Sequence, residues 1–115
     1  MGGHPVLLLT TTGRRSGRAR RTPMQFDVVD GDPVVVAAAR GAATPPAWWL
    51  NLEADPDVTV QIGRHAWNAR AITVTGEERR RLWPRICARN PQLDALQRKA
   101  GRELPLVRLE DLPSQ

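Results

Sequence analysis

Residues Val6 to Ala39 read VLLLTTTGRRSGRARRTPMQFDVVDGDPVVVAAA and contain the strand and turn signals that most strongly indicate the fold. The first part of this stretch, Val6–Thr12, is apolar and then threonine-rich, which is typical of a β-strand. Two glycines bracket the polar residues 13–17 and predict a turn. Residues 20–29 follow this turn, and we expect them to pair antiparallel with the first strand.

A second turn signal comes directly after this pair. The dipeptide Asp30-Gly31 favours a type I′ hairpin, because both central positions of that turn need a positive φ. Residues 33–39 are expected to return from the turn as a third strand. The three strands would then lie side by side in meander order.

The rest of the chain alternates helices with further strands. Thr75 and Glu78 have the spacing of a capping box, and Gly101 is expected to end a helix. Strands that pair by hairpins, with short helices inserted between them, indicate an α+β fold built on an antiparallel sheet or barrel. The predicted elements are helices over residues 47–54, about 76–89 and 93–100, a hairpin of strands 58–62 and 65–73, and a last strand over residues 104–109.

Length and composition are those of one globular domain, which we predict over residues 1–115. The chain is 41% apolar and 25% charged, close to globular averages. Its longest apolar run, residues 34–39, is far too short to cross a bilayer, and the N-terminus lacks the pattern of a secretion signal. The single Cys87 excludes an intramolecular disulfide. A cytoplasmic, reducing compartment fits these features best.

The positive charge is concentrated in one short window. The net charge is +5, from 17 basic and 12 acidic residues. Arg14, Arg15, Arg18, Arg20 and Arg21 lie in a window that contains no acid, whereas basic and acidic residues balance from position 27 onward. We expect this window to attract an anion.

The residues of this window have the chemistry of a phosphate cradle. Two glycines let the backbone turn tightly, and Arg15 and Arg20 can form charge-assisted hydrogen bonds with phosphate oxygens. Arg40, after the third strand, could converge on the same anion. The pattern is neither a Walker A loop nor a Rossmann fingerprint. Because runs of charge are often only solvated faces, the residues alone leave a specific anion site and a solvated hairpin tip both open.

Two adjacent indoles, Trp48 and Trp49, stand at the start of the helix predicted over residues 47–54. Their large apolar area predicts that at least one of them is buried in the core. The other could form the wall of a pocket for a planar heterocycle, with the small side chains at 37–39 leaving room for it. Packing and pocket are both open at this point.

No metal site or nucleophile is indicated. His4 and His65 are the only histidines, and the chain has no Cys-x-x-Cys or His-Glu-x-x-His motif, so no metal is expected. Cys87 lies in the predicted amphipathic helix and is expected to pack as a small core hydrophobe. The acids at positions 30, 32, 77 and 78 belong to a turn and a helix start, where acids are favoured for local reasons.

Several short motifs are spread over almost the whole chain. They are LLTTTGRRSG at residues 8–17, Arg20 and Pro23, Trp48 with Asn51-Leu52, Asp55-Pro56-Asp57-Val58, Leu82-Trp83-Pro84 and Arg102-Glu103-Leu104-Pro105. In this order and spacing they resemble the deazaflavin-dependent nitroreductase family. The resemblance implies a split β-barrel, similar to FMN-binding barrels. It also implies that the barrel binds coenzyme F420, a deazaflavin with a lactyl-phosphate and oligoglutamate tail.

The resemblance carries the family's coenzyme-binding positions onto this chain. An anionic tail agrees with the arginine window. The positions that bind the tail fall on Arg14, Arg15, Ser16 and Arg20, and the segment that passes the deazaflavin falls on Thr22, Pro23 and Met24. The loop beside the ring falls on Ala38, Ala39 and Arg40. The start of the helix beside the coenzyme falls on Ala47, Trp48 and Asn51.

The resemblance also implies the reaction. The family's deazaflavin favours hydride transfer over single-electron steps, so we expect an F420H2-dependent oxidoreductase. Its acceptor would be a small two-electron acceptor: a quinone, an activated alkene or a nitro compound. Nitro-reducing members place a serine where this chain has Ala39 and a tyrosine where it has Gln25, and this chain contains no tyrosine. No catalytic acid is therefore assigned.

Partners follow from the same resemblance. Members often have a longer N-terminal arm that closes the pocket or touches membrane, whereas this chain begins a few residues before its first strand. No stable membrane anchor is therefore expected. Split barrels of this type often pair, so a homodimer is a further expectation.

Three alternatives stay open. A split barrel could bind FMN, haem or another ligand, because a fold does not determine a function. A non-catalytic carrier of F420 would have the same residues. A nucleic-acid-binding module has less support, since no aromatic stacking platform accompanies the arginines, and we expect no nucleic-acid partner.

Overall fold

The computed structural model describes residues 5–112, so His4 lies outside the described residues. Within them, seven strands form one antiparallel sheet in the order β2-β1-β5-β6-β7-β4-β3. The strands are β1 (Val6–Thr12), β2 (Ala19–Gln25), β3 (Asp27–Val29), β4 (Asp32–Val36), β5 (Asp57–Ile62), β6 (His65–Val74) and β7 (Leu106–Asp111). The helices are α1 (Ala47–Ala54), α2 (Gly76–Arg89), α3 (Gln92–Ala100) and the short 3-10 helix η1 (Ala39–Gly41).

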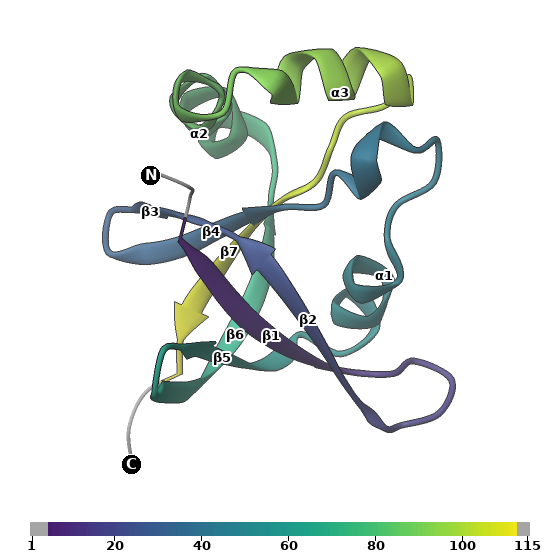
Figure 1. Cartoon of the computed structure of the whole chain (residues 1–115), viewed down its shortest axis with the longest axis vertical. Coiled ribbons are helices and arrows are strands. Elements are labelled where there is room, and N and C mark those ends of the chain that lie inside the picture. The colour runs from purple at the N-terminus through teal and green to yellow at the C-terminus, as the bar shows by residue number, and fades with distance from the viewer. Residues whose placement is uncertain (1–4, 113–115) are drawn as a thin grey trace.

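The sheet is curled into an open barrel. Strands β2 and β3 lie at opposite ends of the strand order, yet a single residue, Phe26, joins them. The two edges of the sheet must therefore approach each other, which a flat sheet does not allow (Figure 1). The backbone amide of Phe26 donates a hydrogen bond to the carbonyl oxygen of Pro5 at 3.2 Å. The expected α+β antiparallel split barrel with inserted short helices is confirmed.

The expected three-strand meander is wrong. Residues 20–29 do not form one strand: β2 pairs with β1, whereas β3 pairs with β4 at the far edge. The reason is that Phe26 and Asp27 are both buried, which breaks the alternation of a regular strand and bends the chain. The turn at Asp30-Gly31 is as predicted, with φ values of 53° and 89°.

Several predicted element bounds also change. Strand β1 and helix α1 have the predicted bounds, but β4 ends at Val36 because the chain turns into η1. Strand β7 begins at Leu106, two residues later than predicted. Thr75 precedes α2 but makes no capping hydrogen bond, since Gly76 enters the helix with a φ of 60°. Gly101 ends α3 in the left-handed conformation, as predicted.

Two groups of buried apolar side chains fill the fold. Burying an aliphatic side chain of this size stabilises a fold by about 1.5–3 kcal/mol. Helices α2 and α3 lie together over one end of the sheet, and α1 lies at its side (Figure 1). None of the helices within residues 5–112 is long and apolar enough to cross a membrane. The inner group contains Leu7, Leu9, Phe26, Val35, Leu52, Val58, Val60, Ala69, Ala71, Val107 and Leu109, and the group under α2 and α3 contains Val29, Val34, Val74, Leu82, Ile86, Leu93 and Leu106.

Candidate functional site

The loop between β1 and β2 is closed by its own backbone. The Gly13 amide donates to the Arg18 carbonyl oxygen and the Gly17 amide to the Gly13 carbonyl oxygen, both at 2.8 Å. The Arg18 amide donates to Ser16 Oγ at 3.1 Å. A Cβ atom at position 13 would lie 2.7 Å from Ser16 Oγ and 3.3 Å from the Arg18 carbonyl oxygen, so a side chain there would force Ser16 and the Arg18 backbone to shift.

Asn51 attaches this loop to helix α1. Its Oδ1 atom accepts hydrogen bonds from the Arg14 amide at 3.2 Å and from Arg14 Nη1 at 2.9 Å. Its Nδ2 atom lies 3.5 Å from Thr11 Oγ1 on β1. Because Asn51 is buried, this contact holds the arginine loop against the first turns of α1.

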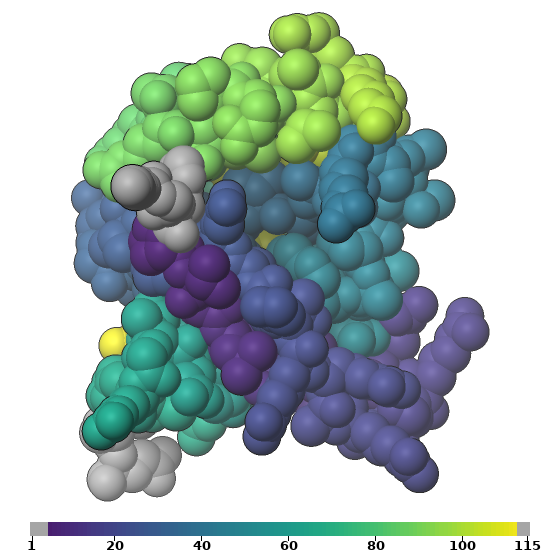
Figure 2. All heavy atoms as spheres, in the orientation of Figure 1, coloured from purple at the N-terminus to yellow at the C-terminus, as the bar shows by residue number. Residues whose placement is uncertain are grey.

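The loop, β2 and the start of α1 surround a cavity of about 600 Å³. In Figure 2 the β1–β2 hairpin that forms its wall projects at the lower right of the molecule. Gly13, Ala19 and Arg21 line the cavity together with the eight residues named next, and none of the described lining residues is acidic. The structure therefore brings together eight of the predicted site residues: Arg14, Arg15, Ser16, Arg20, Thr22, Ala47, Trp48 and Asn51.

The cavity is strongly positive. Arg15, Arg20 and Arg21 are exposed, and within the described part of the chain none of them has a carboxylate partner. Each guanidinium group can offer two parallel N–H donors to a phosphate or carboxylate group. This donor set fits a ligand with several negative charges.

A second cavity, of about 500 Å³, lies under α3, and Met24, Ala38 and Arg40 line it. Figure 2 shows a hollow between α3 and the strand β2. Arg40 thus does not converge on the first cavity as expected, because the turn of η1 directs it under α3. Pro23, exposed on β2, and Ala39, inside the turn, line neither cavity. The other lining residues are Phe26, Val34, Val36, Leu93 and Leu96, with the polar Gln25, Asp27, Asn90 and Gln92.

A buried polar pair in the wall of this second cavity was not predicted. Asn90 Nδ2 donates to Asp27 Oδ2 at 2.9 Å, and both side chains are buried. Arg89 Nη1 lies 3.8 Å from Asp27 Oδ1. The two partners are far apart in the sequence, and no local pattern announces their contact.

The segment between β4 and α1 has an unusual backbone. Ala39, Arg40 and Gly41 follow one another with φ values of 47°, 56° and 79°. A side chain in this left-handed region costs about 1–3 kcal/mol, so such a conformation persists only where its surroundings hold it. The sequence predicted strand and loop here and no strain.

The two tryptophans serve different cavities. At least one of Trp48 and Trp49 was predicted to be buried in the core, whereas both are half-buried and pack against the inner core group. Trp48 lines the arginine-rich cavity. Trp49 lines a third cavity, of about 480 Å³, and its Nε1 atom donates to Thr73 Oγ1 at 3.2 Å.

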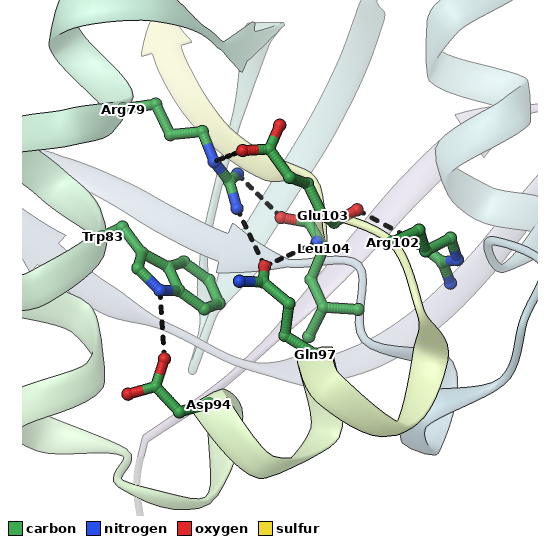
Figure 3. Close-up of polar contacts among 7 residues, drawn as sticks. All are labelled: Arg79, Trp83, Asp94, Gln97, Arg102, Glu103 and Leu104. Carbon is green, nitrogen blue, oxygen red and sulfur yellow. Dashed lines mark hydrogen bonds and ion pairs between the residues drawn. The ribbon is translucent and has the colours of Figure 1, made fainter.

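The third cavity contains none of the predicted site residues, and its central arginine is already engaged. Arg79 Nη1 donates to the Leu104 carbonyl oxygen at 2.8 Å and Nη2 to Gln97 Oε1 at 3.0 Å. Its Nε atom lies 3.4 Å from Glu103 Oε2, and its guanidinium stacks over the Trp83 ring at 4.8 Å (Figure 3). This arginine joins α2 to the segment before β7 and is not free for a ligand.

Cys87 is half-buried beside the core group under α2 and α3. Burial, and then the neighbouring Asp94 carboxylate, raise the pKa of its thiol to about 11. The thiol therefore stays protonated near neutral pH, which does not suit a nucleophile. Within residues 5–112 no three metal-ligating side chains come together.

Comparison with known proteins places this chain in a family. The profile of the F420H(2)-dependent quinone reductases matches residues 1–111. The chain belongs to the F420H(2)-dependent quinone reductase family. The deazaflavin family resemblance of the motifs is thereby confirmed, and F420 is the coenzyme named for this family. The nitroreductase subtype is not part of this finding.

Individual members of the quinone reductase family and solved structures agree with this placement. A putative F420H(2)-dependent quinone reductase of Mycobacterium tuberculosis is 35% identical over 103 residues, which are 90% of this chain and 87% of that protein. The F420-H2 dependent reductase FDR-A is 32% identical with a TM-score of 0.82, over 95% of this chain and 100% of that chain. A structure described as a domain-swapped dimer is 33% identical with a TM-score of 0.82, and the match covers 92% of this chain and 80% of that chain.

Proposed function

We propose that this protein binds coenzyme F420 and, with the reduced coenzyme, transfers a hydride to a small two-electron acceptor, a quinone in the first place. The observation that carries the proposal is the set of exposed arginines, Arg15, Arg20 and Arg21, at one cavity whose described lining has no acid. Membership of the quinone reductase family supports both the coenzyme and the acceptor.

The arginine-rich cavity suits the phosphate and glutamate tail of F420. Arg15 and Arg20 would pair with its anionic oxygens, and Arg14, fixed by Asn51, would close the cavity beside α1. The Ser16 oxygen already accepts the Arg18 amide, so its hydroxyl proton is free to donate to an anion.

The second cavity suits the flat ring and the acceptor. Met24, Phe26 and Leu96 give it an apolar wall against which a ring can pack, while Ala38 leaves space for the ring. When bound, reduced F420 supplies the hydride for the reaction. Arg40 at the edge of this cavity would attract a carbonyl oxygen that gains negative charge.

The acceptor proposal places quinones before activated alkenes and nitro compounds. The family is named for quinone reduction, and the described lining of the second cavity offers Gln25 but no hydroxyl group. A quinone that has accepted the hydride needs one proton to become a hydroquinone, and it can take this proton from solvent. Quinone reduction therefore needs no catalytic acid from the chain.

The test is the oxidation of F420H2 by a short-chain quinone, followed by the return of F420 absorbance. We expect turnover with the quinone and slower turnover with a nitroaromatic. Binding without turnover would favour the carrier alternative. Binding of FMN or haem in place of F420 would favour a different split-barrel function, and salt-sensitive binding of DNA in place of F420 would favour the nucleic-acid alternative.

Assembly as a homodimer is part of the proposal. It is supported by a similar structure that is described as a domain-swapped dimer. Sedimentation velocity over a range of protein concentrations tests it, and a monomer at all concentrations would contradict it.

A further inference from the structure

The motif Arg102-Glu103-Leu104-Pro105 lines neither the arginine-rich cavity nor the cavity under α3, yet it contacts the segment that joins them. Arg102 Nε donates to the Ala43 carbonyl oxygen at 2.9 Å, and Nη2 donates to the Ala42 carbonyl oxygen at 3.0 Å. One guanidinium group thus holds two successive carbonyl groups, a fixed geometry that a lysine does not reproduce.

Lys99 and Gly41 continue this contact one turn earlier. Lys99 Nζ lies 3.4 Å from the Arg40 carbonyl oxygen, at hydrogen-bond distance. A Cβ atom on Gly41 would lie 3.2 Å from the Leu96 carbonyl oxygen, so the segment lies directly against the backbone of α3. The left-handed residues 39–41 therefore lie against α3 and are contacted by Lys99, and Arg102, two residues after the end of α3, contacts residues 42 and 43, which follow them.

Arg102 is itself held in place. Arg79 and Gln97 both bind the backbone of Leu104. Arg79 Nη1 donates to the Leu104 carbonyl oxygen, and the Leu104 amide donates to Gln97 Oε1 at 2.9 Å. Figure 3 shows these contacts on one side of the segment and Arg102 extending away on the other. The buried Arg79 therefore fixes the segment from which Arg102 reaches residues 42 and 43.

The held segment connects the two cavities. Ala38, before the turn, and Arg40, within it, line the cavity under α3, and after the turn the chain enters α1 with Ala47 and Trp48 in the arginine-rich cavity. We propose that Arg102, with Lys99, is a positioning residue for the coenzyme: it fixes residues 39–43 so that Arg40 and the start of α1 face one ligand together. This inference rests on the proposed function.

The experiment measures the Kd for F420 by titration of coenzyme fluorescence, and steady-state kinetics with F420H2 and a quinone, for the wild type, Arg102→Ala, Arg102→Lys and Arg98→Ala. Arg98 is a matched control, because it lies on α3 and makes no side-chain hydrogen bond or ion pair among the described residues. We expect Arg102→Ala to raise KM for F420H2 about fivefold or more, the effect of losing about one hydrogen bond, with kcat nearly unchanged. Arg102→Lys should recover part of this loss, and Arg98→Ala should have the wild-type KM.

A double-mutant cycle identifies the route of the effect. If Arg102 acts through residues 39–43, adding Arg102→Ala to Arg40→Ala raises KM less than Arg102→Ala does alone. A wild-type KM for Arg102→Ala overturns the inference, as does a variant that only loses thermal stability and active fraction. A wild type that neither binds nor oxidises F420H2 overturns the proposed function, and this inference with it, so the two failures are distinguishable.

Discussion

Asn51 Oδ1 accepts two hydrogen bonds from Arg14, one from its backbone amide at 3.2 Å and one from its guanidinium at 2.9 Å. A buried side chain of α1 thereby fixes both the path and the side chain of the arginine loop. The shape of the arginine-rich cavity depends on this one amide group.

Two substitutions of Asn51 separate its structural role from its place in the cavity. Asn51→Ala leaves the Arg14 donors without their acceptor, so we expect a loss of about 1–3 kcal/mol in the free energy of unfolding and weaker F420 binding. Asn51→Asp keeps the acceptor oxygens but adds a negative charge. It should stay near wild-type stability and still bind the anionic coenzyme more weakly. Urea unfolding and F420 titration measure the two effects, and wild-type affinity in both variants would contradict this role.

Arginines that line the cavity should contribute more to coenzyme binding than a neighbouring arginine that does not line it. Arg15→Ala and Arg20→Ala are each expected to weaken F420 binding by about 1.5–3 kcal/mol, the range of a charged hydrogen bond. Arg18 is the matched control, because it lies in the same loop and carries the same charge but does not line the cavity. Its replacement by alanine should change the Kd much less. Equal losses in all three variants would mean a diffuse charge effect and no phosphate cradle.

Much of this fold follows from local sequence patterns. The apolar and threonine-rich run predicted β1, and the Asp30-Gly31 pair predicted the turn between β3 and β4. Gly101 predicted the end of α3. Each of these signals acts within a few residues. The break at Phe26 was missed because the apolar pattern continues through it. Its cause is tertiary: the chain bends so that β3 can pair with β4 at the other edge of the sheet.

The candidate site divides in the same way. The arginine loop and the start of α1 were assigned to one site from the resemblance, and they line one cavity. Arg40 was expected there too, but three consecutive positive φ values turn it under α3. Two of those residues are not glycines, so composition gives no warning of the turn. The contacts made with this segment by Lys99 and Arg102 come from residues about 60 positions away.

The buried Arg79 should be important for stability. Arg79→Met removes hydrogen bonds to the Leu104 carbonyl oxygen and to Gln97, and we expect it to lower the free energy of unfolding by about 2–4 kcal/mol. Glu103→Gln removes only an exposed partner and should cost less than about 1 kcal/mol. Urea unfolding of both variants is the measurement. A loss for Glu103→Gln as large as that for Arg79→Met would show that the ion pair, and not the backbone contact, is the stabilising part.

The thiol of Cys87 should react slowly. With its pKa raised from 9.0 to about 11, its thiolate fraction at pH 8 is about 100-fold below that of an ordinary thiol. Alkylation by iodoacetamide at pH 8 should accordingly be about 100-fold slower in the folded protein than in urea. Asp94→Asn removes one cause of the shift and should speed the reaction. Equal rates in the folded and unfolded protein would show that the thiol is neither buried nor perturbed.

In the proposed function, the arginine-rich cavity binds coenzyme F420. The most direct measurement is a titration of the wild-type protein with F420, followed by coenzyme fluorescence, with FMN titrated in parallel. We expect a Kd for F420 of about 1 μM or lower, with FMN binding much more weakly. No saturable binding of F420, or tighter binding of FMN, would contradict it.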